Sequence, residues 1–316
     1  MSEYLVKIWF GRIHGFHAAK QYFIRGRRDR AIRNIGWCFY GSIYVGADTG
    51  IDRDNGKTIT TPGILFGGKL ANDNADTPWG WQLDSESKYS DISWARPRPV
   101  DLDGYVFGNG ATAHLTYRPD LNSKLGIYAG YGATHFGIES TNGTFLAGPI
   151  TEVTSLDVLA AIGLEGFTQL GEATWIQGRV GIIDPLYSAA SAGDGTTTVD
   201  VSDTDILGKN VGGMVAVSLS HDFSDAIAVH GDASLAALHL FGGDVSSTLI
   251  LVAGADYKFD AAPVKLGIAG GYVYNATGGD GNGFFNVSTR LTYSFGAPSA
   301  SSTGRLFSGS AFSLGL

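Results

Sequence analysis

A histidine and a serine lie five residues apart in the run His135-Phe-Gly-Ile-Glu-Ser140. These are residue types of nucleophilic hydrolysis, in which a base within hydrogen-bond reach activates the hydroxyl and a third group orients that base. The spacing alone enforces no such contact, and the following Thr-Asn-Gly segment is typical of a turn. We therefore expect no catalytic residue and no enzyme, with hydrolysis at His135 and Ser140 as an alternative hypothesis.

Aspartates recur in the segment 184–209, at Asp194, Asp200, Asp203 and Asp205. Calcium needs six to eight oxygen ligands, and Asp203-x-Asp205 supplies too few to predict a site. His114 and His230 are interpreted as hydrogen-bonded wall residues, and the single Cys38 excludes a Cys-based zinc site and an internal disulfide. No glycine-rich phosphate loop opens a helix. The expectation is no metal and no cofactor.

The composition is unusual for a water-soluble protein of 316 residues. Glycine occurs 46 times, and charged residues make up only 16% of the chain, against roughly a quarter in soluble domains. No stretch approaches the ~18 consecutive apolar residues of a membrane-spanning helix. If the chain crosses a membrane, it must do so with strands.

Charge divides the chain near residue 40. Residues 1–40 hold eight of the 22 Lys and Arg residues but two of the 30 acids, giving +6, so the other 276 residues carry −14. The arginine cluster Arg25–Arg33 comes too late for a signal peptide, in which a basic start precedes an apolar core. We interpret residues 1–40 as a basic extension, either poorly ordered or read from a mis-assigned start or frame. A nucleic-acid or anionic-lipid patch is the alternative; we expect no nucleic-acid partner.

Apolar residues alternate with polar ones over most of the remainder, most clearly in Phe285–Phe295. A period of two is typical of strands with one buried face. The pattern predicts an all-β chain of about twelve strands, most of them long enough for the ~9–11 residues that a tilted membrane strand needs. These strands are expected near 41–49, 62–71, 78–88, 103–118, 123–136, 155–166, 171–183, 210–221, 225–237, 247–259, 263–275 and 283–295.

From the second strand onward, short and long connections alternate. The long ones include 89–102, 137–154 and 184–209. Outer-membrane barrels have short periplasmic turns and long extracellular loops, and twelve strands from Gly41 place every short turn on one side. Aromatic residues gather at both ends of the strands, as membrane interfaces favour. They are Tyr117, Tyr257, Phe259, Tyr293 and Phe295 beside short turns, and Tyr105, Phe107, Tyr131, Tyr272, Tyr274 and Phe285 beside long loops.

The run Asn286-Val-Ser-Thr-Arg-Leu-Thr-Tyr-Ser-Phe295 resembles the C-terminal insertion signal of bacterial outer-membrane β-barrels, porin-like members in particular. The resemblance covers residues 41–295 as architecture and implies a closed antiparallel transmembrane barrel. It implies an insertion signal at Tyr293 and Phe295, with the barrel-assembly machinery, outer-membrane lipid and lipopolysaccharide as partners. In that group the last Phe usually ends the chain, whereas residues 296–316 follow here. They are interpreted as a flexible tail, with a short strand over Arg305–Leu314 as the alternative.

The strand face opposite the apolar one predicts the lining of the barrel. The predicted lining residues are Asp84, Glu86, His114, Arg118, Lys124, Asp157, Arg179, His230, Asp232, Asp256, Lys265 and Arg290. The same face carries Lys69, Gln82, Tyr128, Glu165, Glu172, Gln177 and Lys258, which together make seven acids and seven bases. Selectivity arises from rings of one charge sign, so this balance predicts none.

These features favour a porin-like passive channel for small polar solutes in the bacterial outer membrane. The many glycines on the lining face favour an open passage. The alternatives are a structural or adhesin-like surface barrel and an outer-membrane lipid hydrolase. Twelve strands lie between the eight that leave no channel and the sixteen that leave an open one.

Overall fold

The computed structural model describes residues 38–54, 57–73, 78–95, 101–120, 122–140, 151–193, 198–203, 211–239, 245–260, 262–277 and 280–296. Every regular element in these ranges is a β-strand. The strands are β1 Cys38–Asp54, β2 Lys57–Asp73, β3 Trp79–Ala95, β4 Asp101–Tyr117, β5 Ser123–Ser140, β6 Glu152–Gln169, β7 Thr174–Gly193, β8 Thr198–Asp203, β9 Gly212–Asp222, β10 Ile227–His239, β11 Val245–Lys258, β12 Val264–Thr277 and β13 Asp280–Phe295.

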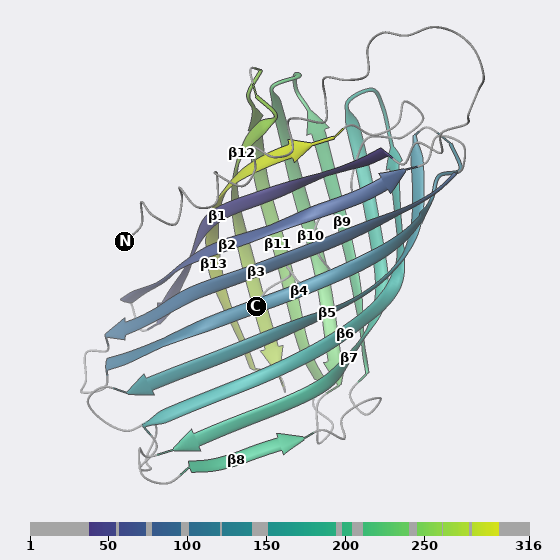
Figure 1. The fold of residues 1–316 in the computed structure, drawn as a ribbon. Helices are drawn as coiled ribbons and strands as arrows, with labels where there is room; N and C mark the ends of the chain where they lie inside the picture. Colours follow the sequence, from purple (N-terminus) through teal and green to yellow (C-terminus); the bar gives the residue numbers. More distant parts are fainter. Residues whose placement is uncertain are drawn as a thin grey trace, which may run out of the picture. The chain divides into compact units, whose positions relative to one another are not determined.

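Twelve of these strands form a closed ring, as the sequence predicts. Neighbours in the chain pair antiparallel from β1 to β7 and from β9 to β13, and β7 pairs with β9. The ring closes where β1 pairs with β13, with Gly41 opposite Phe295 and Ile51 opposite Phe285. Figure 1 shows β1–β7 along the near wall and β9–β12 along the far wall. The fold is a closed antiparallel β-barrel of twelve strands.

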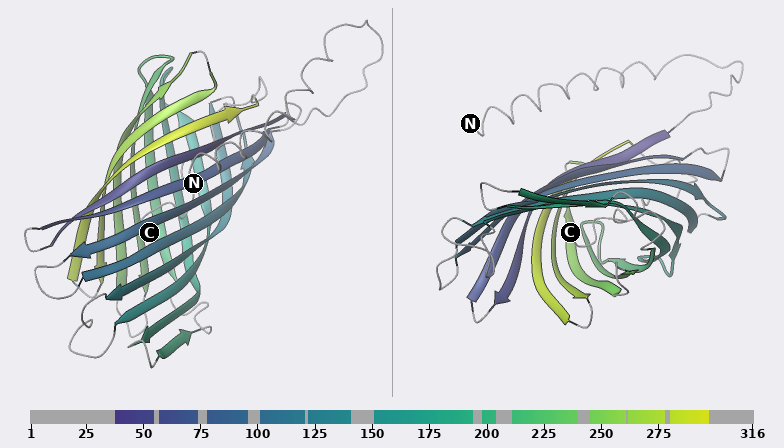
Figure 2. Two further views of the ribbon diagram at one scale, coloured as in Figure 1. Left: turned by 60° about the vertical axis from the view of Figure 1, so that its left-hand side comes forward. Right: turned by 90° about the horizontal axis from the view of Figure 1, so that it is seen from below.

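Strand β8 stands outside the ring. It pairs with the end of β7, Thr198 opposite Gly193 and Asp203 opposite Ser188, whereas β9 pairs with β7 only up to Ile183. Figure 2 shows β8 beside that end of β7. The β7–β8 hairpin therefore extends the wall beyond β9.

The alternation of side chains sorts the wall into two faces. Along β9, Val215, Val217 and Leu219 are exposed on the outside, while Ala216 and Ser218 between them face inward and are half-buried. Successive side chains of a strand point to opposite faces, so one period-two pattern produces an apolar outer wall and a polar inner one. Water-soluble proteins bury their large apolar side chains; this chain presents them outward.

Aromatic rings mark two levels on the outer wall. Trp79 and Tyr117 pack with ring centroids 4.9 Å apart beside a short turn, and Tyr89 stacks on Tyr105 at 6.3 Å further along the same strands. Ten residues separate Trp79 from Tyr89 in β3. At ~3.3 Å per residue and a tilt of ~45°, the levels lie roughly 23 Å apart, close to the ~25 Å apolar band of outer-membrane barrels.

The predicted strand ends need correction on the long-loop side. Strand β3 continues to Ala95 and β4 starts at Asp101, so most of the loop expected at 89–102 is a paired hairpin. Likewise, the segment 137–154 contains the end of β5 and the start of β6, and the segment 184–209 contains the end of β7 and all of β8. Their Gly, Ser, Thr and Asp content indicated loops, but cross-strand pairing satisfies their backbone groups all the same.

The chain ends fall partly outside the described residues. Strand β1 begins at Cys38, three residues before the predicted barrel start at 41. Residues 1–37 and 297–316 lie outside the described ranges, and so do most of the predicted basic extension, the tail and the alternative strand Arg305–Leu314. Among the described residues, no helix is long and apolar enough to span a membrane.

Candidate functional site

A buried charge cluster, Asp84, His114, Glu165 and Arg179, lies on the inner wall. Glu165 accepts hydrogen bonds from Arg179 Nη2 at 2.9 Å and Nε at 3.3 Å, and its other oxygen lies 2.5 Å from His114 Nδ1. His114 Nε2 is 3.3 Å from Asp84 Oδ2. All four side chains are at most 4% exposed. Ionised groups shielded this completely from water must be paired. Here Arg179 pairs with Glu165, and Asp84 lies beside both Lys69 and the His114 ring.

The strand register and one glycine bring the side chains of this cluster together. Glu165 on β6 faces Arg179 on β7 in register, but His114 is on β4, with β5 between. The β5 residue beside Glu165 is Gly126, where an added Cβ would come within 3.0 Å of the Glu165 carboxylate. The missing side chain leaves the space through which Glu165 reaches across β5.

Tyr128 lies between the charge cluster and a neighbouring group of buried apolar side chains. The Arg179 guanidinium lies 4.9 Å from the Tyr128 ring centroid, a cation–π geometry. The Tyr128 hydroxyl reaches over Gly163 and Gly181, the next residues in its register row. Beyond them Tyr128 packs with Ala161, Ile183 and Met214 as a buried apolar group. The inner wall over β3–β7 and β9 is therefore closely packed.

A second group of charges lies where the ring closes. Tyr44 donates a hydrogen bond to Glu86 at 2.5 Å, and Arg290 Nη2 lies 3.3 Å from the same carboxylate oxygen and over the Tyr44 ring at 4.2 Å. Glu86 is on β3 and Arg290 on β13, so β1 and β2 lie between them. The register neighbours of these charges are Gly67 and Gly46. At Gly67 an added Cβ would meet the Tyr44 hydroxyl at 2.6 Å, so this glycine leaves room for the contact between Tyr44 and Glu86.

Two further ion pairs lie along the same part of the wall. Lys88 Nζ is 2.5 Å from Asp48 Oδ2, which also accepts a hydrogen bond from Asn286. Lys265 Nζ donates to Asp256 Oδ2 at 2.8 Å, and His230 lies between Asp256 and Asp232, 4.0 Å from each. Each Lys and Arg side chain in these groups has an acidic partner.

Most predicted lining residues are in these groups. Three others lie apart: Lys124 is buried, Asp157 accepts a hydrogen bond from Ser188 at 2.6 Å near the long-loop side, and Arg118 follows the end of β4. Since Tyr117 is the last residue of β4, Arg118 belongs to the following turn and not to the lining that was predicted for it. The structure adds Tyr44, Asp48 and Lys88, which the period-two pattern of β1 and β3 could have identified.

The inner glycines call for a different interpretation from the predicted one. At Gly254 an added Cβ would meet the His230 ring at 2.6 Å, and at Gly267 it would meet the Asp256 carboxylate at 2.6 Å. Gly130 adjoins Thr112, and only Gly108 among those named in this paragraph has nothing within 4 Å. Most of these glycines accommodate a neighbour's side chain, so they do not by themselves indicate an open passage.

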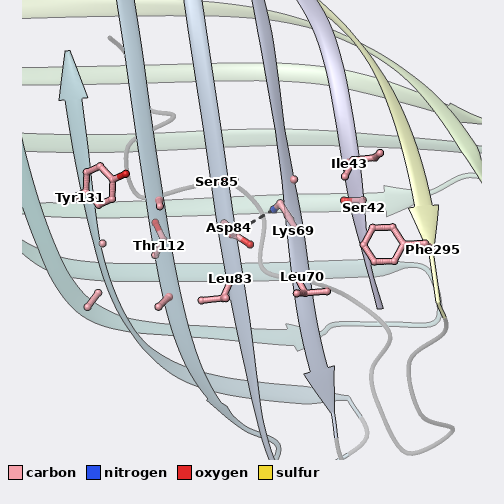
Figure 3. Close-up of a pocket in the computed structure, with 15 residues that line it drawn as sticks. Ser42, Ile43, Lys69, Leu70, Leu83, Asp84, Ser85, Thr112, Tyr131 and Phe295 are labelled. Atoms are coloured by element: carbon pink, nitrogen blue, oxygen red, sulfur yellow. Dashed lines mark ion pairs between the residues drawn. The ribbon is translucent and has the colours of Figure 1, made fainter. Parts of the chain in front are cut away.

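The predicted insertion residues lie in the last strand. Tyr293 pairs with Ile43 and Phe295 with Gly41, on the outside of the ring. Figure 3 shows Phe295, Ile43, Leu70, Leu83 and Tyr131 among the residues that line a pocket on the wall, with the Lys69–Asp84 pair between them. The role of Tyr293 and Phe295 in insertion stays a prediction.

The candidate hydrolytic residues do not share a face. His135 lies on the outer side of β5, 3.4 Å from the Tyr105 hydroxyl, whereas Ser140, five positions on, falls on the inner side by alternation and is buried. Asp200 and Asp203 are in β8, and Asp194 and Asp205 lie outside the described ranges. In the described part of the chain, no three His, Cys, Asp or Glu side chains are placed to hold a metal ion.

Comparison with known proteins finds matches among solved structures. No protein-family model and no curated protein sequence matches it. One matching solved structure is the translocator domain of the autotransporter NalP from Neisseria meningitidis, which is 13% identical in sequence; the match covers 93% of this chain and 97% of that one, with a TM-score of 0.49. Another is the toluene transporter TodX from Pseudomonas putida, which is 9% identical; the match covers 81% of this chain and 89% of that one, with a TM-score of 0.47. A third is the KdgM porin in complex with oligogalacturonate, which is 11% identical; the match covers 80% of this chain and 99% of that one, with a TM-score of 0.39. All three are bacterial outer-membrane β-barrels; the closed ring itself is shown by the strand register.

Proposed function

We propose that this chain is a passive channel of the bacterial outer membrane for small polar solutes. The observation that carries the proposal is the exposure of charged side chains on the inner face. Arg290 and Lys265 point inward by alternation, yet their side chains are 43% and 42% exposed. Inside a closed ring, such exposure indicates space for water beside Arg290 in β13 and beside Lys265 at the start of β12. A water-filled path with a polar lining is what a hydrophilic solute needs.

Single-channel recording in planar lipid bilayers tests this proposal. Refolded protein is expected to produce discrete conductance steps. Gly108→Trp is expected to lower the step by roughly half, because Gly108 is inward, beside Lys88 in register, with open space at its Cβ position. Phe107→Trp, one residue away on the outer face, is the matched control and should leave the step unchanged. Absence of steps from correctly folded protein would contradict the channel.

A second candidate is a barrel whose projecting part binds a surface partner. The β7–β8 hairpin favours it, because β7 runs ten residues past its last pair with β9 and ends in paired structure. Both functions fit one fold, and the recording separates them. Folded protein without conductance that binds lipopolysaccharide or a host surface through residues 184–203 would support this second candidate.

We propose no catalytic role for His135 or Ser140, because the two side chains lie on opposite faces of β5. Purified barrel is expected to release no fatty acid from phospholipid vesicles. Fatty-acid release that is lost in both His135→Ala and Ser140→Ala would overturn this expectation. The partners that we propose are outer-membrane lipid and lipopolysaccharide on the apolar wall, and the barrel-assembly machinery at Tyr293 and Phe295.

A further inference from the structure

The ion pairs on the inner wall are asymmetric in their contact with water. Besides Arg179–Glu165, which is almost fully buried, four Lys or Arg residues in the described part of the chain pair with an acid there, and in each pair the base is the more exposed partner. The exposed fractions of the side chains, base then acid, are 43% and 17% for Arg290–Glu86, 42% and 19% for Lys265–Asp256, 30% and 3% for Lys88–Asp48, and 16% and 3% for Lys69–Asp84.

The geometry points to a channel whose solutes are anions, chiefly small carboxylates and phosphates, guided by Lys88, Arg290 and Lys265. This inference rests on the proposed channel function and names its solute class. A count of charges by sign predicts no preference, since the lining holds as many acids as bases. The exposure of the charged groups, however, decides which sign a solute meets.

The acids are held against the wall by other wall residues. Glu86 accepts from Tyr44, Asp48 from Asn286, and Asp84 from Gln82 at 2.8 and 3.0 Å. These short side chains stay near the backbone, whereas the longer Lys and Arg side chains extend over them. Each pair is thus a dipole with its positive end toward the water.

The three most exposed bases of these four pairs occupy one continuous arc of the barrel. Lys88 and Arg290 lie in the same register row, on β3 and β13, with only Leu65 and Gly46 between them in that row. Lys265 is on β12, two positions along from Gly267, the register neighbour of Arg290. An anion moving beside this arc meets one positive group after another.

Two observations limit the strength of the effect. Asp232 is an acid with a 33% exposed side chain, and it is 4.0 Å from His230, which is 28% exposed. The buried charge cluster, with Glu165 and Arg179, has too little contact with water to interact closely with a solute. We therefore expect a moderate preference for anions over cations, about threefold. An effect of this order is expected when a positive charge faces the solute and its counter-charge lies a few ångströms further away in a water-filled lumen.

The test is the reversal potential of the reconstituted channel across a tenfold gradient of potassium chloride. The reversal potential of the wild type is expected to have the same sign as the chloride equilibrium potential, and to correspond to a chloride-to-potassium permeability ratio of about three. Replacing Lys88, Arg290 and Lys265 by Gln should bring that ratio to about one or below, and Asp232→Asn, the matched removal of an exposed acid, should raise it. All variants are compared only after heat-modifiability on a gel has shown that they are folded.

The outcomes separate the inference from the function on which it rests. Folded protein with no conductance contradicts the channel itself. Conductance with a ratio of one or below in the wild type contradicts the anion path while leaving the channel intact, and this result depends on no variant. An unchanged ratio in the folded triple variant would show that other groups set the selectivity, and would also overturn the inference.

Discussion

Replacing Arg179 by Met is expected to lower the free energy of unfolding by about 3–5 kcal/mol, because it removes one partner of a buried ion pair. Glu165 would keep its contact with His114 at 2.5 Å but lose both hydrogen bonds from the guanidinium. Its side chain has no exposed surface through which water could replace them. Met fills similar volume, so the loss reports on the charge.

The matched control is Lys265→Met, which removes the same charge from an exposed pair. Lys265 is 42% exposed, and exposed ion pairs contribute ~0–1 kcal/mol. Both variants are measured by denaturant unfolding of the barrel folded in lipid vesicles. Equal losses for the two variants would mean that the cluster around Glu165 is hydrated, which would contradict the packed inner wall.

Val217→Arg is expected to cost about 2–4 kcal/mol, the cost of an Arg on the lipid face near the middle of a bilayer. Val217 is 46% exposed on the outer wall, six residues from Phe223 at the short-turn end. At ~3.3 Å per residue and ~45° of tilt, that distance is roughly 14 Å along the membrane normal, about half of the apolar band.

Ser218→Arg places the same side chain one residue further, on the inner face. Ser218 pairs in register with Asp232 on β10, whose carboxylate can pair with the new charge. We expect this variant to unfold within about 1 kcal/mol of the wild type. The reverse order, with Ser218→Arg the more harmful, would show that β9 presents the opposite faces.

Much of this fold could be predicted from the sequence, because one local rule governs the wall. In β13, the alternation from Phe285 to Phe295 identifies the strand, its lipid face and its inner face together. The same rule applied to each strand gives twelve strands. A count of twelve is even, so the chain can return to its starting side and close.

Long-range contacts could not be predicted in this way. The alternation predicts that both Glu86 and Arg290 lie on the inner face, but their contact depends on closure between β1 and β13 and on Gly67, which leaves room for Tyr44. Likewise, Glu165 reaches His114 only because Gly126 lies between them. Residue types indicate a face, whereas contacts across several strands depend on register.

The strand ends and the inner glycines differ from the sequence predictions for related reasons. The Ser, Thr, Asp and Gly residues of segment 184–209 indicate loops in most sequences, yet Ser188–Gly193 pair with β6 on one side and β8 on the other. Gly254 and Gly267 suggested empty volume, but His230 and Asp256 occupy it. In the first case neighbouring strands supply the backbone hydrogen bonds, and in the second case a side chain of a neighbouring strand fills the space beside the glycine.

Closure of the ring in register is the central claim, and a disulfide between β1 and β13 tests it most directly. Ala47 and Thr289 are register partners on the outer face, within the Cα separation that a disulfide bridges. With Cys38 replaced by Ser, Ala47→Cys with Thr289→Cys is expected to form an intramolecular disulfide on mild oxidation of the folded protein, seen as a mobility shift after boiling without reductant. Ala47→Cys with Ser288→Cys, whose second side chain faces inward, should not. Absence of the first disulfide, or equal formation of both, would contradict the closed barrel.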